Sequence, residues 1–382
     1  MDIATILILI SAFLLIWGYF LYPITLFFLS KIIKNPVNTD NSFQPDITII
    51  ISAHNEEKFI EEAIESVYKS GFSPEKIKIL AGSDGSNDRT FDILSKLSGK
   101  YPGLSVFSFD RIGKNAVINA LMDKAETGII FFMDADIRLR EGVIKKLLSY
   151  LSNNRVGAVI SSMKSKGGKG ESAGEFGEKF YQKIEAKIRI YESKIHSTTN
   201  ALGAFYAVKT ELLEPLPDDI VPDDFYPILL TLEKRKRVIF VPEAEVLEVR
   251  PKSTGDEFHR RIRVAASAMT ALKQKSKLLL PQYGWVALFL FSHKVLRWAT
   301  PLFLLIILIS TFFVENTTGL FIIAIIQLYF YIGALLGYLA EKILINNIIL
   351  KLPLFSVLMS IGYFLAFVRF LRGLDNSKWQ RN

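Results

Sequence analysis

The 382-residue sequence contains no cysteine and only four histidines. The absence of cysteine excludes disulfide bonds, thiolate zinc sites and cysteine nucleophiles. The histidines lie far apart in the sequence, so we do not expect a histidine-based transition-metal site. These two shortages exclude several classes of enzyme and metalloprotein before any motif is considered.

No aromatic-basic module for nucleic-acid recognition is present, although the formal charge is +8 at pH 7. The basic residues are scattered, and many lie beside apolar segments. Attraction to anionic lipid headgroups explains this pattern better than binding to nucleic acid. We therefore expect membrane lipids, and no nucleic acid, among the partners.

Apolar residues are concentrated at the two ends of the chain, whose mean hydropathy is +0.28. The stretch from Ile3 to Leu29 is long enough to span a membrane and is broken only by Tyr22-Pro23. It has no basic start and no clear cleavage site, so we expect a retained anchor and not a signal peptide. Because Lys31 and Lys34 follow it, the positive-inside rule predicts that the next domain is cytoplasmic.

The chain becomes apolar again after Pro281. The segment 284–298 carries His293, Lys294 and Arg297, which predicts an interfacial helix with snorkelling cations. Three further stretches are candidate spans, at 299–314, 320–340 and 353–371. Three crossings would place the C-terminus outside, whereas its basic residues favour the inside. This conflict leaves open whether one segment is interfacial or re-entrant.

Between the apolar ends, short apolar runs alternate with amphipathic segments, which predicts a mostly parallel sheet covered on both faces. We expect strands over residues 47–52, 76–81, 104–109, 128–133, 156–161, 203–208 and 238–241. We expect helices over residues 59–69, 113–123, 141–153, 180–195, 223–233 and 257–273, and another that Ser86 or Asn87 caps and that ends near Lys96. The glycine- and lysine-rich segment 165–177 predicts a loop.

The strand over 128–133 ends in Asp134-Ala135-Asp136. Residues two apart in an extended chain point to the same side, so the two carboxylates converge if the strand tip stays extended. Open α/β sheets bind ligands at the carboxyl ends of their strands. The pair is suited to a hard divalent cation that keeps phosphate oxygens as its other ligands. The alternative is that this tripeptide only caps the segment after it.

Polar loops follow two other predicted strands. The first supplies Asn55 and Glu56, and the second supplies Asp84. In a parallel sheet these loops gather at one edge, where Asp84 or Glu56 would accept hydrogen bonds from a base or ribose. Lys114 would add positive charge near a diphosphate. A simple turn at Asp84 and a solvated lysine at Lys114 remain the plain alternatives.

Asp223-Asp224 offers a carboxylate that is free to act as a general base toward an attacking hydroxyl. The negative charge on a leaving nucleoside diphosphate would need a cation and an arginine, for which Arg263 or Arg261 is available. Two adjacent acids at a helix start also complement the helix dipole, and the arginines also suit lipid headgroups. The sequence does not decide between these interpretations.

Together these motifs resemble a known family. The segment 47–57, the S-D-G-S-x-D loop, Gly113-Lys114-Asn115, the D-x-D pair and Asp223-Asp224 occur in the order and at the spacing of membrane-bound glycosyltransferase family 2 enzymes. These include the cellulose-, chitin- and hyaluronan-synthase-like proteins. The resemblance covers about residues 45–270 and the arrangement of apolar segments around them.

The resemblance implies a GT-A fold, a nucleotide-sugar donor and Mg or Mn. Ala53, Asn55, Glu56 and Asp84 would face the nucleoside and Lys114 the donor; Asp134 and Asp136 would hold the diphosphate and metal, Asp224 would be the base, and Arg263 would serve the leaving group. It also implies inversion at the anomeric carbon by one displacement. The expected parts are a transmembrane helix over 1–30, a linker over 31–45, a cytosolic GT-A domain over 46–255, interfacial helices over 256–298 and a transmembrane region over 299–382.

One motif departs from the synthases of that family, which carry Q-x-x-R-W on the interfacial helix. In this chain the aligned residues are Arg260 to Val264, so the arginine is kept as Arg263 and the tryptophan is replaced by valine. Valine offers no aromatic platform for a sugar ring. We therefore expect transfer of a single sugar to a lipid-linked or growing glycan at the plasma membrane. The alternatives are a polyprenyl-phosphate sugar synthase and a non-catalytic subunit of a polysaccharide export complex.

Overall fold

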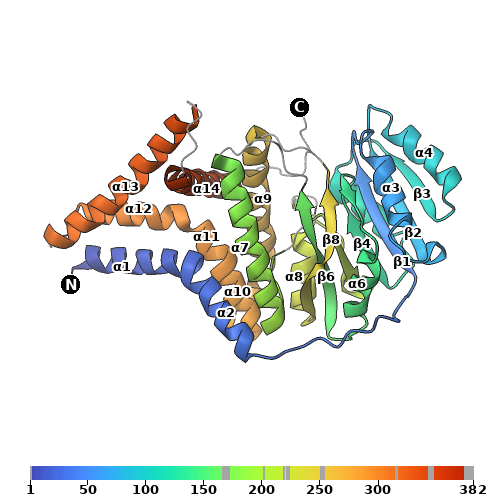
Figure 1. Cartoon of the computed structure of the whole chain (residues 1–382), viewed down its shortest axis with the longest axis horizontal. Helices are drawn as coiled ribbons and strands as arrows, with labels where there is room; N and C mark the ends of the chain where they lie inside the picture. Colours follow the sequence, from blue (N-terminus) through green and yellow to red (C-terminus); the bar gives the residue numbers. More distant parts are fainter. Residues whose placement is uncertain are drawn as a thin grey trace.

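The computed structural model describes residues 2–165, 173–200, 203–217, 220, 224–249, 254–314, 317–342 and 348–373. A sheet with helices on both faces forms one half of the molecule, and long helices from both ends of the chain form the other half (Figure 1). Helices α7 (Ala173–Ile195) and α9 (Thr254–Gln274) stand between the two halves.

The sheet has eight strands in the order β3-β2-β1-β4-β7-β6-β8-β5. The strands are β1 (Ile47–Ala53), β2 (Ile77–Asp84), β3 (Leu104–Phe109), β4 (Ile129–Met133), β5 (Ile137–Arg138), β6 (Val156–Ser165), β7 (Phe205–Lys209) and β8 (Arg237–Glu248). Strands β1 to β4 are mutually parallel, but β7 runs antiparallel to both of its neighbours, β4 and β6. The sheet is therefore mixed, and the expectation of a mostly parallel sheet holds for its first half.

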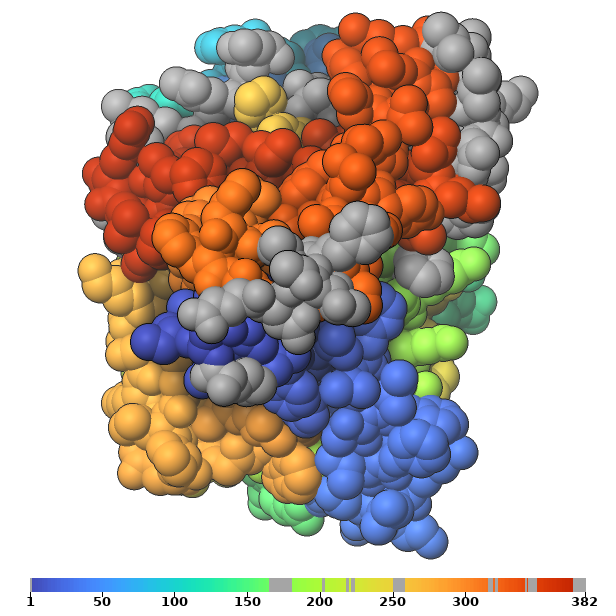
Figure 2. All heavy atoms as spheres, turned by 90° about the vertical axis from the view of Figure 1, so that its left-hand side faces the viewer, coloured from blue at the N-terminus to red at the C-terminus, as the bar shows by residue number. Residues whose placement is uncertain are grey.

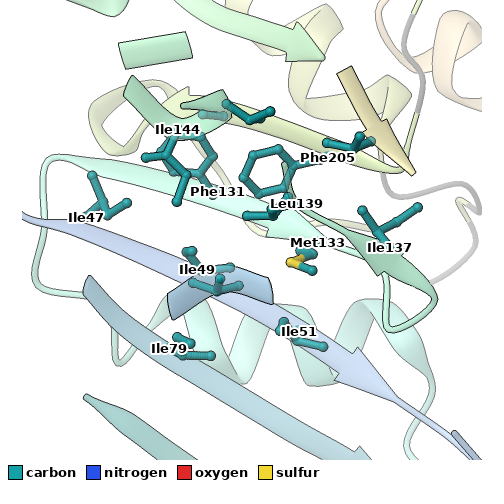
Figure 3. Packing of buried hydrophobic residues seen from close by; sticks show 14 of the residues in the cluster. Ile47, Ile49, Ile51, Ile79, Phe131, Met133, Ile137, Leu139, Ile144 and Phe205 are labelled. Carbon is teal, nitrogen blue, oxygen red and sulfur yellow. The ribbon is translucent and has the colours of Figure 1, made fainter. Parts of the chain in front are cut away.

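Helices cover both faces of this sheet. They are α3 (Ile60–Tyr68), α4 (Thr90–Lys100) and α6 (Val143–Leu151) on one side, and α5 (Lys114–Met122), α8 (Phe225–Glu233) and α9 on the other. Ile47, Ile49 and Ile51 point to the first side because alternate residues of a strand share a face (Figure 3). Burying each such side chain contributes about 1.5–3 kcal/mol to stability. A shift of the strand by one residue would expose these side chains, so their burial fixes which residues stand at the end of the strand.

Aromatic pairs fix the position of β4 against β7. Phe131 stacks on Phe205 with ring centroids 5.1 Å apart, and Phe132 stacks on Tyr206 at 4.8 Å. One pair lies on each face of the sheet. The tip of β4, where the D-x-D pair begins, is therefore held from both sides.

Two expectations about local structure were wrong. Helix α7 begins at Ala173, so the loop predicted over 165–177 does not extend beyond residue 172, and residues 166–172 lie outside the described part. Helix α4 begins at Thr90, and the carboxylate that accepts its N–H is Asp88, at 2.9 Å, and not Ser86 or Asn87. An ionised carboxylate is a stronger acceptor for the first amides of a helix than a hydroxyl or an amide oxygen.

The segment between the first helices and β1, which we name the strap (residues 33–46), is bonded to the domain along its length. Asn35 accepts hydrogen bonds from Arg155 at 2.6 Å and Arg237 at 3.2 Å, and it donates to the carbonyl of Ile195 at 3.1 Å. Further along, the Asp40 N–H donates to the carbonyl of Ser149 at 3.1 Å. The expected linker is thus docked on the domain surface.

The remaining helices form the other half of the molecule. They are α1 (Ile3–Ile16), α2 (Tyr22–Ile32), α10 (Trp285–Leu290), α11 (Leu296–Trp298), α12 (Thr300–Thr311), α13 (Thr317–Lys342) and α14 (Ile348–Leu371). Two π-helical turns interrupt these helices, η1 (Trp17–Leu21) and η6 (Phe291–Val295). Short 3₁₀ turns occur elsewhere along the chain, at η2 (Pro74–Lys76), η3 (Thr210–Leu212), η4 (Ser276–Leu279) and η5 (Pro281–Tyr283). Figure 2 views this end, where the N-terminal helices and the orange-to-red C-terminal helices form the visible face.

Three helices in the described residues are long and apolar enough to cross a membrane: Ile3–Ile32, Ile322–Ala340 and Ile349–Leu371. The span expected over 299–314 is only the 12-residue α12, about 18 Å long, which is too short to cross alone. It meets the helix Trp285–Trp298 at a bend of 58°, so this pair is either a broken span or a re-entrant segment. Large apolar side chains such as Phe13, Leu328 and Phe364 are exposed on these helices, as expected for surfaces that face lipid.

Candidate active site

The loops after β1, β2 and β4 meet at one edge of the sheet, as the sequence predicted. The three strands are parallel neighbours, with Ala53 level with Ser83 and Ile50 level with both Leu80 and Phe132. Their carboxyl ends therefore open toward the same side. This is the edge at which open α/β sheets bind ligands.

The loop after β1 is bonded to the loop after β2. The Asn87 N–H donates to Asn55 Oδ1 at 2.9 Å, and the Asn55 N–H donates to Ser86 Oγ at 3.2 Å. Asn55 adopts φ = +54°, a conformation that asparagine tolerates better than most residues. The Glu56 N–H donates to Thr90 Oγ1 at 2.7 Å, and Glu56 is buried. Asn55 and Glu56 therefore shape this edge of the cleft.

A small pocket lies between these loops and the start of α5. It is lined by Ser52, His54, Asp84 and Lys114. His54 Nδ1 is 2.7 Å from the carbonyl oxygen of Asp84, which joins the ends of β1 and β2. Because side chains alternate along β1, Ala53 points into the hydrophobic core and not into the pocket. A contact between Ala53 and a nucleoside would therefore use its backbone.

Asp84 is almost fully buried and holds the turn that leads into α5. The Gly113 N–H lies 3.2 Å from each carboxylate oxygen of Asp84, and Arg111 Nη1 is 3.5 Å from one of them. Gly113 has φ = +95°, which glycine adopts without strain. Asp84 thereby positions Lys114, the first residue of α5.

Lys114 and Asp134 form an ion pair across the cleft. Lys114 Nζ donates to Asp134 Oδ1 at 2.8 Å, with Lys114 15% and Asp134 39% exposed. The lysine was expected to face the donor, and the aspartate to hold the diphosphate and metal. The structure brings the two together, so the cleft holds a cation beside an accessible carboxylate.

The described residues contain no group of three or more His, Asp or Glu side chains arranged to hold a metal ion. Asp134 and Asp136 are nevertheless both partly exposed at the end of β4, and Asp134 already faces a positive charge. The carbonyl of Asp136 accepts the Val249 N–H at 3.1 Å, which anchors the turn. Two carboxylates fit a hard cation whose remaining ligands come from a diphosphate.

Asp224 lies beside the tip of β4. A Cβ atom on Gly203 would be 2.9 Å from Asp224 Oδ2, so the carboxylate packs directly against that glycine. The next residue, Ala204, accepts the Asp134 N–H at 3.2 Å through its carbonyl. Two consecutive residues thus link Asp224 to the D-x-D pair. Asp223 lies outside the described residues.

Arg263 lies on α9, at the border with the membrane helices. Its neighbours Ile262 and Ala266 pack against Ala366 of α14. Arg261 donates to Met359 Sδ at 3.2 Å, also on α14. The role of Arg263 at a leaving group stays a prediction.

Three side chains of this edge were absent from the predicted set: Ser52, His54 and Arg111. The alternation of β1 carried a usable signal, since Ser52 and His54 are the polar residues that share a face opposite Ile51 and Ala53. Arg111 gave no such signal. It has φ = +48° in a turn and reaches Asp84 through tertiary structure alone.

Comparisons with known proteins identify the family that this domain resembles. Residues 48–212 match the model of the family described as Glycosyl transferase family 2. The chain is 27% identical over 203 residues to a dolichol-phosphate mannosyltransferase of Pyrococcus furiosus. This alignment covers 51% of this chain and 55% of that protein. It is 26% identical to the uncharacterized glycosyltransferase YkcC of Bacillus subtilis, over 78% of this chain and 88% of that protein. The chain spans about half the length of the Pyrococcus relative, and less of several others.

Among solved structures, the mannosyltransferase PcManGT of Pyrobaculum calidifontis, in complex with GDP-Man and Mn²⁺, aligns with a TM-score of 0.71 and 19% identity. The alignment covers 96% of this chain and 99% of that protein, so the fold extends to the helical half. The narrower resemblance to cellulose- and chitin-synthase-like enzymes stays a prediction. Residues 48–212 of this chain therefore carry a glycosyl transferase family 2 domain, and the fold around it is of the GT-A type.

Proposed function

We propose that this protein is an inverting glycosyltransferase that moves a sugar from a nucleotide-sugar donor to a lipid-linked or growing glycan acceptor at the cytoplasmic face of the plasma membrane. The observation that carries the proposal is the convergence of Asp84, Lys114, Asp134 and Asp224 on one edge of the sheet. Lys31 and Lys34 after the first apolar segment support a cytoplasmic domain.

The donor would lie along this edge, with its nucleoside near the loops after β1 and β2 and its diphosphate near Lys114. A dianionic diphosphate would compete with Asp134 for the Lys114 ammonium, which lies 2.8 Å from that carboxylate. Asp134 and Asp136 would hold Mg²⁺ or Mn²⁺, which would supply positive charge to the diphosphate. Lys114 adds charge of the same sign from the protein itself.

Asp224 would act as the general base. Its contact with Gly203 and the hydrogen bond from Asp134 to Ala204 keep it beside the D-x-D turn. A carboxylate there would accept the proton of the acceptor hydroxyl as the hydroxyl oxygen attacks the anomeric carbon. Attack from the face opposite the leaving diphosphate inverts the configuration at that carbon.

The test is to incubate purified protein in a membrane mimetic with a panel of nucleotide sugars and divalent ions, and to measure nucleoside diphosphate release. We expect release with one donor class, dependent on Mg²⁺ or Mn²⁺, and loss of at least about 100-fold in Asp136→Ala. A protein that binds no nucleotide sugar, or whose activity survives both chelation and Asp136→Ala, would contradict the proposal. A non-catalytic subunit of an export complex would bind a donor without turnover.

A second candidate function is a polyprenyl-phosphate sugar synthase. The similarity to the Pyrococcus dolichol-phosphate mannosyltransferase and the membrane-length helices beside the domain both favour it. A lipid phosphate acceptor has no hydroxyl proton to remove. Asp224→Asn should therefore lower kcat by about 100-fold or more for a hydroxyl acceptor and by less than about tenfold for a phosphate acceptor.

A further inference from the structure

A layer of ionisable residues, most of them buried, lies where the catalytic domain meets the membrane helices. We name Glu185, Arg189, Glu192, His293, Lys294 and Arg297 the charged layer. The first three come from α7, and the others come from η6 and α11 (Figure 1). The sequence suggested an interfacial helix with snorkelling cations at 284–298, but these side chains turn toward the protein.

Both carboxylates of the charged layer have hydrogen-bond or ion-pair partners within the protein. Glu185 Oε2 lies 2.9 Å from His293 Nε2, and Glu185 also pairs with Arg297. Glu192 Oε1 lies 2.9 Å from His293 Nδ1 and accepts from the Tyr22 hydroxyl at 2.6 Å. Both carboxylates are therefore engaged within the protein, with His293 between them.

Lys294 is the basic residue of the charged layer that contacts the start of α8. Its Nζ donates to Asn200 Oδ1 at 2.6 Å and lies 5.3 Å from the ring centroid of Phe225, the residue after Asp224. The Asn200 amide in turn donates to Glu185 at 2.7 Å. Lys294 is partly exposed, whereas its neighbours His293 and Arg297 are buried.

The local backbone explains how Lys294 comes to face the domain. It belongs to η6, a π-helical turn inside the segment 285–298. A π turn rotates the side chains that follow it relative to a continuous α-helix, and such turns occur frequently at functional sites. The turn is held by Trp17, whose Nε1 donates to Ser292 Oγ at 3.0 Å.

We propose that Lys294 is a positioning residue for glycosyl transfer, which keeps Asp224 in place from the membrane side of the cleft through its contact with the Phe225 ring at the start of α8. The Lys294 ammonium lies over the ring of Phe225, which directly follows Asp224, so loss of this contact would let the start of α8 and the carboxylate beside it shift. This inference rests on the proposed function, because it assumes that Asp224 is the base. Lys294 lies outside residues 48–212, which match the family 2 model. The inference therefore gives the segment 285–298 a direct part in organising the active site.

Steady-state kinetics of Lys294→Met, Lys294→Arg and Lys275→Met tests the inference. Lys275 is a matched control because its ammonium lies 5.4 Å from the ring centroid of Tyr226, one residue further along α8, and pairs with Glu233 at 2.9 Å. We expect Lys294→Met to lower kcat by at least about 30-fold with donor KM within about threefold. Lys294→Arg should recover at least about tenfold of that loss, and Lys275→Met should stay within about threefold of wild type. A kcat of Lys294→Met within threefold of wild type would overturn the inference.

A double-mutant cycle separates this inference from the proposed function. If Lys294 acts through Asp224, the double variant Asp224→Asn/Lys294→Met is slower than Asp224→Asn by less than about threefold. Losses that multiply would overturn the inference. An intact kcat in Asp224→Asn would remove the base assignment and the catalytic part of the inference together. Thermal unfolding then tests the pair alone: equal Tm losses from Lys294→Met in wild type and in Asp224→Asn would show that the two residues do not interact.

Discussion

Gly203 has no side chain, and this leaves room for the Asp224 carboxylate to pack against its backbone. A Cβ atom there would come 2.9 Å from Asp224 Oδ2, closer than side-chain atoms ordinarily approach. We expect Gly203→Ala to displace the carboxylate and to lower kcat by about tenfold or more, with donor KM nearly unchanged, because misplacing a reacting group by about 1 Å is costly. The measurement is steady-state kinetics at saturating acceptor.

Gly128 is a suitable control for that variant. It precedes β4 at the opposite end from the D-x-D pair, and a Cβ atom there would meet nothing within 4 Å. Gly128→Ala should therefore leave kcat and KM unchanged. Equal losses in the two alanine variants would indicate a general effect on folding and would count against the placement of Asp224.

At the same scale, the sequence predicts the identities of the acidic residues in the cleft better than their partners. Asp134 and Asp136 follow a buried strand, so their place at the strand tip follows from alternation. The Lys114–Asp134 pair joins residues 20 positions apart, and the contact between Gly203 and Asp224 joins two separate loops. Contacts of this kind depend on how the layers pack, which no local pattern encodes. The expectation that Lys294 extends toward water failed for this reason, because its contact with Asn200 also depends on how the layers pack.

At the scale of single elements, the start of α4 provides a test of capping. Asp88 accepts the Thr90 N–H at 2.9 Å and its hydroxyl at 2.5 Å, and it also accepts the Glu57 N–H at 3.1 Å. Partial burial would raise the pKa of Asp88, but these hydrogen bonds outweigh burial and hold the pKa below its ordinary value. We expect Asp88→Ala to lower the free energy of unfolding by about 1–2 kcal/mol at pH 7.

The loss of stability in Asp88→Ala should depend on pH, because the pKa of Asp88 is lowered in the folded protein. A group whose pKa is lower in the folded protein stabilises it above the unfolded pKa, about 4 for aspartate, and stops doing so as the pH falls through the folded value. The Tm difference between wild type and Asp88→Ala should therefore be full at pH 6 and shrink toward pH 3. A difference that stays constant over this range would mean that the charge of Asp88 contributes nothing.

The elements themselves were largely predictable, and the errors have identifiable causes. β1, β3 and β4 have the clear apolar runs of buried strands, and their expected bounds are within about one residue of the observed ones. β5 has two residues and exists only because β8 pairs with it, so its sequence carries no strand signal. The antiparallel insertion of β7 could not be read either, because strand direction depends on the path of the chain between strands.

For the whole molecule, the side of the membrane on which the domain lies is open to a direct test. The chain contains no cysteine, so one introduced cysteine is the sole thiol. Lys58 is exposed in the loop after β1, and Lys58→Cys should react with a membrane-impermeant maleimide in lysed cells and not in intact cells. Labelling in intact cells would contradict a cytoplasmic domain. Conversion of Phe13 in α1, which is 54% exposed, gives a control position that lipid should protect in both preparations.

The docked strap between the first helices and β1 has a consequence for which acceptors this enzyme reaches. A free tether of this length would let the cleft sweep over a wide arc above the bilayer. The bonds from Asn35 to Arg155, Arg237 and Ile195 prevent that movement. Under the proposed function, the cleft would be held at one height over the headgroups, and the distance between an acceptor group and its lipid anchor would then decide which acceptors reach the reactive carbon.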